Sequence, residues 1–384
     1  MADVRQTKKK KQLIKSSFDL TFLVLVIIIL LLGLVMMFSA SYADAYYNHN
    51  KDSFFYIKRQ GIWAAFGLIV MFVMLNFDYH KLHKFVWPLL IVTYGLLCLV
   101  LFMPKINGVH RWIIYGPVNI QPSEIAKFAV VLVFSHLISI YAAKNDNRMK
   151  SFKYGVLPFL LILGSVAGLM VLEPHLSGTI IILFIGFTLM FVGGTALRWF
   201  GIGGSMAGGA LLYIVLFTKF IVYAQGRLTT WLDPFSDPKD SGWQTIQSLY
   251  AIGSGGVMGL GLGNSRQKYL YISEPQNDFI FPIICEELGL VGAVIVIVLF
   301  ALLVWRGYVI AMRAPDRFGS LLCVGLITQV GLQAVLNIAV VTNTIPNTGI
   351  SLPFFSYGGS SLVMLLFQMG IILSISRYSS VEQT

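Results

Sequence analysis

Four carboxylates lie between Glu274 and Gly289, in a chain in which only 12% of residues are charged. Asp278 closes the one long polar connection and directly precedes an apolar run. An ionised group at such a border is unfavourable unless it is paired or functional. Asp278, Pro282 and Glu286 fall at i, i+4 and i+8 and so share one helical face, with Glu287 about a third of a turn away. The stretch is therefore the leading candidate for a catalytic site.

A structural alternative exists for Asp278 taken alone, because acids in the first turn of a helix complement its macrodipole. Glu286 and Glu287 lie two turns further along, where that explanation fails. We therefore expect Asp278 to be catalytic and the two glutamates to support it.

Basic side chains accompany these acids in the polar connections. A carboxylate base with cations nearby suits attack by a hydroxyl group while a phosphate or diphosphate departs, because the cations or a metal ion take up the developing charge. No Ser-His-Asp set, His-x-x-x-His pair or cysteine cluster offers another chemistry. The candidate cations are Arg111, Lys127, Arg227, Arg266 and Lys268.

Glu124 and Lys127 stand three residues apart inside an apolar run. This spacing predicts an ion pair on one helix face within the membrane. Such a pair could bind substrate, or it could only fix the helix register.

The composition requires a polytopic membrane protein, with 57% hydrophobic residues and a mean hydropathy of +0.77. At about 20 apolar residues per crossing, the chain predicts an all-α fold with ten transmembrane helices. Cys98, Cys285 and Cys323 each lie inside an apolar run and indicate no disulfide framework. The expected spans are residues 19–40, 58–77, 84–103, 122–142, 155–172, 178–194, 199–222, 279–304, 319–342 and 357–376.

The net charge of +11 has a topological explanation. Most Lys and Arg residues of the short connections fall on one side if the N-terminus is cytoplasmic, as the positive-inside rule requires. The ten spans then place both termini in the cytoplasm, with residues 1–18 as a basic tail. Nucleic acid is not expected as a partner.

Residues 223–278 form the one long connection, predicted as a large extracellular loop between spans seven and eight. It carries enough aromatic and aliphatic residues to pack on the membrane-facing body, and Thr245 to Ile252 predicts a short amphipathic helix. A glycine run from Gly253 to Gly263 follows. It could bring backbone close to a ligand, or it could be a flexible linker; it matches neither a P-loop nor a dinucleotide fingerprint.

The last outer connection, Asn343 to Ser361, is rich in Pro, Gly and Ser. This composition predicts a re-entrant or tightly folded loop whose backbone is satisfied by protein or by a water-lined cavity. An outward-facing transferase has no nucleotide sugar or ATP available, so its donor must arrive anchored in the membrane.

Five stretches resemble the SEDS family of bacterial membrane glycosyltransferases, which contains the FtsW, RodA and SpoVE proteins, over essentially the whole chain. The details resemble the FtsW and SpoVE branch more than RodA. The stretches are Gln121–Lys127, Gly242–Ser248, Gly255–Gly263, Glu274–Phe281 with Glu286–Gly289, and Thr348–Ser361.

The resemblance implies one membrane domain, 1–384, that polymerises lipid II into peptidoglycan with inversion at the anomeric carbon. It implies that Asp278 is the general base and that Glu124 and Lys127 lie in a central cavity. It also implies a class B penicillin-binding protein as partner, beside other division or elongation proteins. Mg²⁺ or Mn²⁺ is the one cofactor considered, and no metal ligands are assigned. The expected substrate contacts are Arg111, Glu124, Lys127, Arg227, Lys268, Ser356, Gly358, Gly359 and Ser360.

Several residues depart from the family pattern. Asn277 replaces the usual Thr before the aspartate, so its hydrogen bonding near Asp278 can differ. His175 stands where an acid is commoner, which puts a role for an acid there in doubt. A lipid II flippase and a non-catalytic division scaffold stay open as alternatives, although a flippase would need access from both faces.

Overall fold

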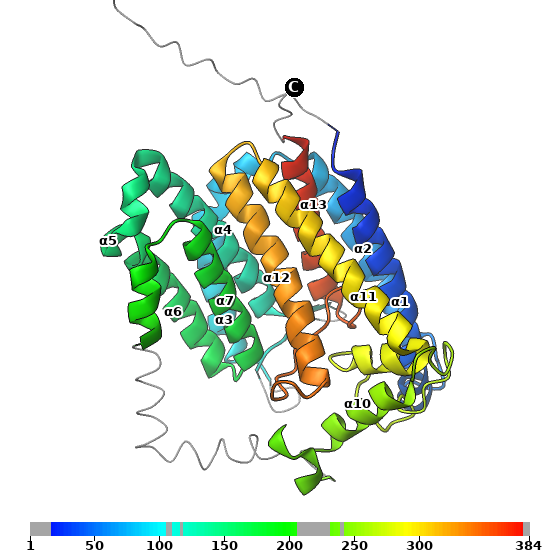
Figure 1. Ribbon diagram of the computed structural model, residues 1–384. Helices are drawn as coiled ribbons and strands as arrows, with labels where there is room; N and C mark the ends of the chain where they lie inside the picture. Colours follow the sequence, from blue (N-terminus) through cyan, green and yellow to red (C-terminus); the bar gives the residue numbers. More distant parts are fainter. Residues whose placement is uncertain (1–16, 105–109, 116–117, 206–230, 239–241, 379–384) are drawn as a thin grey trace, which may run out of the picture.

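The computed structural model describes residues 17–104, 110–115, 118–205, 231–238 and 242–378 (Figure 1). Helices dominate the chain, and the one small sheet pairs β1 with β2 in antiparallel register. The elements are α1 (Leu20–Asn48), α2 (Phe55–Asn76), η1 (Tyr79–Phe85), α3 (Val86–Val100), β1 (Ile113–Tyr115), β2 (Val118–Ile120), α4 (Pro122–Lys144), η2 (Asp146–Lys150), α5 (Phe152–Gly155), α6 (Leu157–Leu172), α7 (Leu176–Val192), η3 (Pro234–Ser236), α10 (Trp243–Ser254), α11 (Ile280–Arg313), α12 (Arg317–Val341) and α13 (Gly359–Arg377).

Eight of the described helices are long and apolar enough to cross a membrane, and α7 is a shorter apolar helix. Helices satisfy their own backbone polar groups, which a lipid environment requires. Nine of the ten expected spans coincide with these helices. Most of the expected span 199–222 lies outside the described residues. Its described part belongs to a helical segment that covers residues 197–205. The chain is a polytopic helical membrane protein.

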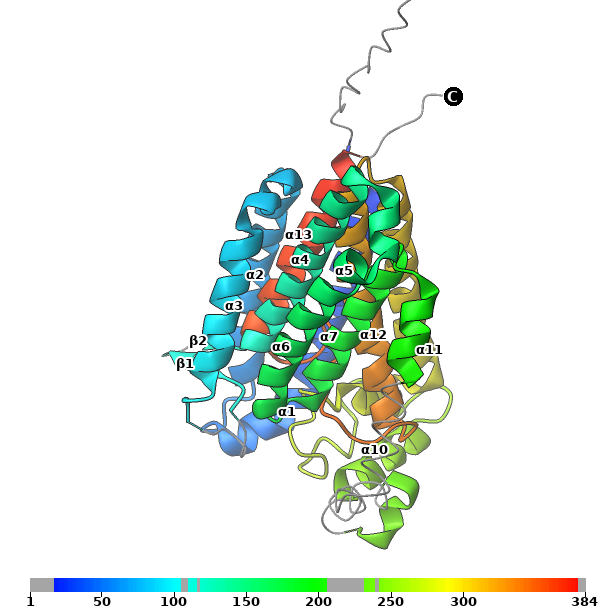
Figure 2. The ribbon, with the colours of Figure 1, turned by 90° about the vertical axis from the view of Figure 1, so that its left-hand side faces the viewer.

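Among the eight candidate spans, α4, α12 and α13 are the most enclosed by protein. Buried residues make up 72% of the apolar stretch of α4, 61% in α12 and 67% in α13, against 22% in α2. Figure 2 shows α4 and α13 between α2 and α3 on one side and α11 and α12 on the other, and Figure 1 shows α13 behind α11 and α12. Small residues permit close approach between helices, as in membrane proteins generally. A Cβ at Gly370 of α13 would meet the carbonyl oxygen of Met71 in α2 at 2.5 Å. Several polar side chains on the three helices are buried in protein, among them Lys127, Gln329, Asn337 and Gln368.

The two described chain ends meet at one end of the bundle. The main-chain N–H of Asp19 donates to Ser376 Oγ at 3.0 Å, and Arg306 forms an ion pair with Asp19 at 2.7 Å. The opposite end, which we call the loop end, carries α10 and the 343–358 loop (Figure 1). The helix predicted at 245–252 is present as α10.

The glycine run packs against a break in α11. Gly289 interrupts that helix with φ of 68°, and the Leu260 N–H donates to the Glu286 carbonyl at 2.9 Å. Gly259 has φ of 80°, and a Cβ there would lie 2.2 Å from the carbonyl oxygen of Glu287. The flexible-linker alternative is therefore wrong for Gly255 to Gly261. These glycines allow contact between two backbones.

The 343–358 loop enters the bundle, as its composition predicts. A Cβ at Gly33, near the middle of α1, would lie 2.4 Å from the Phe354 carbonyl oxygen. Phe355 is buried and its ring lies 6.0 Å from that of Phe300 in α11. This loop reaches from the loop end into the interior.

Candidate functional site

Asp278 lies in a turn two residues before α11, which begins at Ile280. The helical register assumed from the sequence therefore does not apply at this position. Glu286 instead accepts hydrogen bonds from Ser265 Oγ and from the Arg266 N–H. The structure does not bring Asp278 and Glu286 together.

Main-chain contacts fix the turn that carries Asp278. The side-chain amide of Asn337, in α12, donates to the Asp278 carbonyl at 2.7 Å and to the Ile350 carbonyl at 2.6 Å. Ser356 Oγ donates to the Asn277 carbonyl at 2.6 Å. α12 and the re-entrant loop thus hold the two residues 277 and 278 together.

Gln276 links the same turn to the first two helices. Its carbonyl accepts from the Tyr357 N–H at 2.8 Å, and its Nε2 donates to Asp44 Oδ2 at 3.1 Å. Tyr56 OH in α2 donates to the same Asp44 oxygen at 2.8 Å. Because α1, α2, α12 and the re-entrant loop all contribute, Asp278 is positioned by the tertiary fold.

The surroundings of Asp278 favour a proton acceptor with a pKa above that of an ordinary carboxyl. Burial raises the pKa of Asp278 most, and the negative charge of Glu274 raises it further. A hydrogen bond to its own main chain and the positive charge of Arg111 act in the opposite direction. Catalytic bases are commonly tuned upward in this way.

Arg111, whose positive charge acts on Asp278, contacts the turn between α6 and α7. Its guanidinium donates to the Pro174 carbonyl. Burial raises the pKa of Glu173 to about 8, although the positive charge of Arg111 acts to lower it. Burial, with the charges of Arg111 and Lys127, lowers the pKa of His175 to about 3, so this imidazole is neutral.

The predicted pair of Glu124 and Lys127 is present in the first turns of α4. Lys127 Nζ lies 2.7 Å from Glu124 Oε1, and the two side chains are 3% and 12% exposed. A lysine this deeply buried needs such a partner.

Glu124 also lines a polar cavity of about 30 Å³ between α4, α12, α13 and the re-entrant loop. This cavity is bordered by Ser356, whose hydroxyl bonds the residue before Asp278. The lining residues are Glu124, Gln329, Gln333, Ser351, Leu352, Pro353, Phe354, Ser356, Ser361, Leu362 and Leu365. The ion pair and the Asp278 turn are therefore neighbours of one interior space.

Sequence reasoning missed the amides of α12. Gln329, Gln333 and Asn337 recur every four residues within an apolar span, so they share one face, and all three are buried. The signal was visible in the sequence, because three amides at helical spacing are unusual in a membrane helix.

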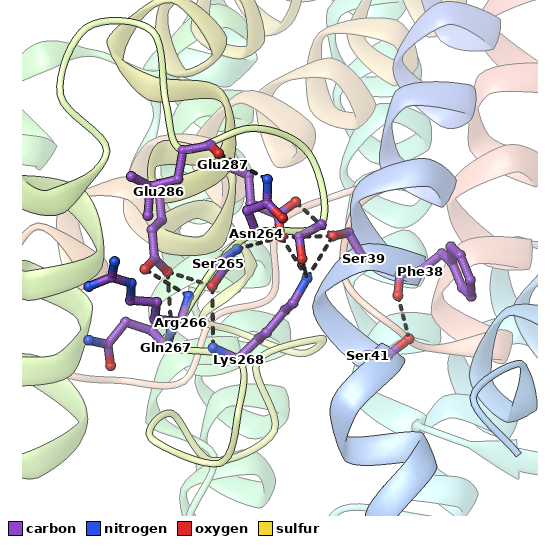
Figure 3. A network of polar contacts seen from close by, with 12 residues as sticks. Phe38, Ser39, Ser41, Asn264, Ser265, Arg266, Gln267, Lys268, Glu286 and Glu287 are labelled. Carbon is purple, nitrogen blue, oxygen red and sulfur yellow. Dashed lines mark hydrogen bonds and ion pairs between the residues drawn. The ribbon is translucent and has the colours of Figure 1, made fainter. Parts of the chain in front are cut away.

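Lys268 lies in a separate buried network (Figure 3). Its ammonium contacts Glu287 Oε1 at 2.9 Å, the Gly263 carbonyl at 2.7 Å and Ser39 Oγ at 3.3 Å. Glu287 also accepts from Ser39 Oγ. All three donors of this lysine are engaged by protein, so the expected contact between Lys268 and substrate is not supported by its position.

The remaining predicted substrate contacts lie in different places. Ser356 lines the cavity, whereas the Gly358 N–H donates to Gln60 Oε1 in α2 at 3.2 Å. A Cβ at Gly359 would lie 2.4 Å from Trp63 Nε1, so this glycine also packs on α2. Ser360 Oγ is buried without a hydrogen-bond partner. Arg227 lies outside the described residues.

A model of a protein family described as "Cell cycle protein", covering FtsW, RodA and SpoVE, matches residues 19–381. The chain belongs to the FtsW/RodA/SpoVE family. Stage V sporulation protein E of Bacillus subtilis (strain 168) is 40% identical over 369 residues, which cover 95% of this chain and 98% of that protein. A probable peptidoglycan glycosyltransferase FtsW of Geobacter sp. (strain M18) is 38% identical over 363 residues, with 94% and 96% coverage.

Solved structures of FtsW/RodA/SpoVE relatives share the fold. A chain from work on the structural coordination of polymerization and crosslinking by a peptidoglycan synthase complex superposes with a TM-score of 0.77. It is 28% identical, with 94% of this chain and 98% of that chain covered. The rod shape determining protein RodA of Thermus thermophilus gives a TM-score of 0.68 at 27% identity, with 95% and 98% coverage.

Within the described ranges, no three His, Cys, Asp or Glu side chains gather as a metal site. Mg²⁺ commonly binds through one or two carboxylates together with phosphate oxygens and water. Asp278 and a bound diphosphate together would supply oxygen ligands of this kind.

Proposed function

We propose that this chain is a peptidoglycan glycosyltransferase that joins lipid II disaccharides into glycan strands. Its family membership and its likeness to a peptidoglycan synthase complex support polymerisation over translocation or scaffolding. The observation that carries the proposal is the fixed turn at Asp278, beside the positive charge of Arg111 and next to a polar interior cavity.

In this mechanism Asp278 accepts the proton of the acceptor sugar hydroxyl as that oxygen attacks the anomeric carbon of the donor. The bond from that carbon to the undecaprenyl diphosphate oxygen breaks, and the anomeric centre inverts. A positioned base of this kind contributes roughly 10²- to 10⁴-fold to the rate.

We assign stabilisation of the departing diphosphate to Arg111, since Lys268 is already engaged inside the protein. Glu286, Glu287 and Lys268 instead hold residues 263–268 against α1 and α11. Arg227 remains a predicted contact. Mg²⁺ or Mn²⁺, if bound with the diphosphate, would neutralise part of the same charge.

The loop end is assigned to the outer face of the bacterial cytoplasmic membrane, with both termini in the cytoplasm. The distribution of Lys and Arg supports this orientation. A class B penicillin-binding protein is the proposed partner, since a related fold occurs in a complex that couples polymerization with crosslinking.

The test compares the wild-type chain with Asp278→Asn, each purified with its penicillin-binding protein and supplied with lipid II. Gel-resolved glycan strands from the wild type alone support the proposal. Asp52→Asn is the matched control, because that carboxylate is exposed and paired with Lys58. Strands from Asp278→Asn would remove the assigned base, and lipid translocation without strands from the wild type would favour a flippase.

A further inference from the structure

Three buried amides, Gln329, Gln333 and Asn337, share one face of α12, and only Asn337 bonds to the Asp278 turn. Asn337 Nδ2 donates to two main-chain carbonyls, whereas its Oδ1 is buried without a hydrogen-bond partner. Gln329 and Gln333, one and two turns before it, are 1% and 6% exposed. Gln329 Oε1 is buried without a hydrogen-bond partner. A buried amide without partners is unfavourable, which points to a ligand that supplies them.

Both glutamines line the polar cavity next to the Asp278 turn. The hydroxyl groups of Ser351, Ser356 and Ser361 share this cavity, and its one carboxylate, Glu124, is paired with Lys127. The lining therefore carries donors and acceptors with little net charge. It suits uncharged hydrogen-bonding groups, whereas a diphosphate would need cations.

The volume of the cavity limits the size of the chemical group that it can bind. About 30 Å³ accommodates roughly two water-sized groups. A hydroxyl or hydroxymethyl group of a sugar has this scale, and a whole sugar ring does not.

We propose that Gln329 and Gln333 form a subsite for an uncharged substituent of the sugar held at Asp278. The subsite makes binding depend on the carbohydrate, so that a disaccharide-bearing lipid is favoured over the bare polyprenyl diphosphate. This inference rests on the proposed polymerase function and deepens it. Neither glutamine contacts the reacting atoms in this scheme; both are specificity residues.

The test measures equilibrium binding of lipid II and of undecaprenyl diphosphate to the full chain carrying Asp278→Asn, which prevents turnover. Gln329→Met and Gln333→Met, alone and together, keep the side-chain length but remove the amides. The double variant should bind lipid II about 10-fold or more weakly, as expected for two lost hydrogen bonds. Its affinity for undecaprenyl diphosphate should stay within about twofold, which also shows that the protein is folded.

Thr328→Val is the matched control, because Thr328 is a neighbouring polar residue of α12 that bonds Tyr308 away from the cavity. It should alter neither affinity. Unchanged lipid II binding in the double variant, or equal loss for both lipids, would overturn the subsite. If the double variant does not purify, the single variants decide the question in the same assay.

Failure of the polymerase proposal is distinguishable from failure of the subsite. If the polymerase proposal fails, strand synthesis persists in Asp278→Asn. If the subsite proposal fails, only the ratio of the two lipid affinities shows it. In otherwise wild-type protein, the glutamine variants should raise KM for lipid II with little change in kcat.

Discussion

The side-chain amide of Asn337 donates a 2.7 Å hydrogen bond to the main-chain carbonyl of Asp278. The two residues are 59 positions apart in sequence, and Asn337 is fully buried. A helix inside the bundle thus sets the position of the turn that carries the proposed base. The same amide donates to the carbonyl of Ile350 in the re-entrant loop, next to the cavity-lining Ser351, so one side chain fixes both segments.

Asn337→Ala should therefore lower polymerisation more than it lowers the amount of folded protein. The substitution leaves two buried carbonyls without a donor, a loss of about 1 to 3 kcal/mol for each unsatisfied group. Strand synthesis and thermal unfolding in detergent are the measurements. Asn343→Ala is the control, because Asn343 makes an equivalent amide bond to the Trp231 carbonyl away from Asp278. Equal loss of activity in both variants would contradict a specific role for Asn337.

Glu274→Gln should shift the acidic limb of the pH–rate profile to lower pH. The negative charge of Glu274 raises the pKa of Asp278, so neutralising it favours the ionised base at lower pH. The glutamine can still accept the hydrogen bond from Asn277 Nδ2. Asp52→Asn should leave the limb in place. A shift of the limb toward higher pH in Glu274→Gln would be inconsistent with Asp278 as the base.

Glu173 should make folding stability fall between pH 6.5 and about 8. Its pKa in the folded protein is about 8 against an ordinary value of 4.5, so the folded state holds a proton that the unfolded state has released. Stability is then lost as pH rises toward the folded pKa. His175 is neutral in both states above pH 6.5 and does not interfere. The unfolding temperature of Glu173→Gln, compared with the wild type across this window, should show a smaller slope; an identical slope would exclude Glu173 as its source.

Lys127→Ala should destabilise the protein by about 3 to 5 kcal/mol at most, because it leaves the Glu124 carboxylate buried without its partner. Adding Glu124→Gln should recover much of the stability lost in Lys127→Ala. If the pair also contacts substrate, the double variant should not recover polymerisation. Lys58→Ala breaks an exposed pair and should leave stability nearly unchanged. Wild-type stability and activity in Lys127→Ala would show that the ion pair is dispensable.

Gly259→Ala should destabilise the contact between residues 255–261 and α11. Its φ of 80° and the 2.2 Å approach of a Cβ to the Glu287 carbonyl both disfavour a side chain, at a cost of at least 1 kcal/mol. Gly253→Ala is the contrasting change, since that glycine lies in α10 with open space around it. It should be neutral or stabilise by about 0.5 to 1 kcal/mol. Thermal unfolding of the two variants should therefore move in different directions.

The sequence alone determined the membrane class, nine spans that coincide with helices, the Glu124–Lys127 pair and the re-entrant last loop. Each depends on a local signal: apolar run length, a three-residue spacing within a helix, or turn-forming composition. The prediction of Asp278 as the base also follows locally, from an acid placed at the edge of an apolar run.

Only the tertiary structure decided which polar groups meet. It placed Glu286, Glu287 and Lys268 in a network with Ser39 rather than at Asp278, and it used the glycine run to contact the broken turn at Gly289. It also brought Asn337 to the turn of Asp278. In a membrane interior, every buried polar group needs a partner, and partners far apart in sequence are chosen by how the helices pack.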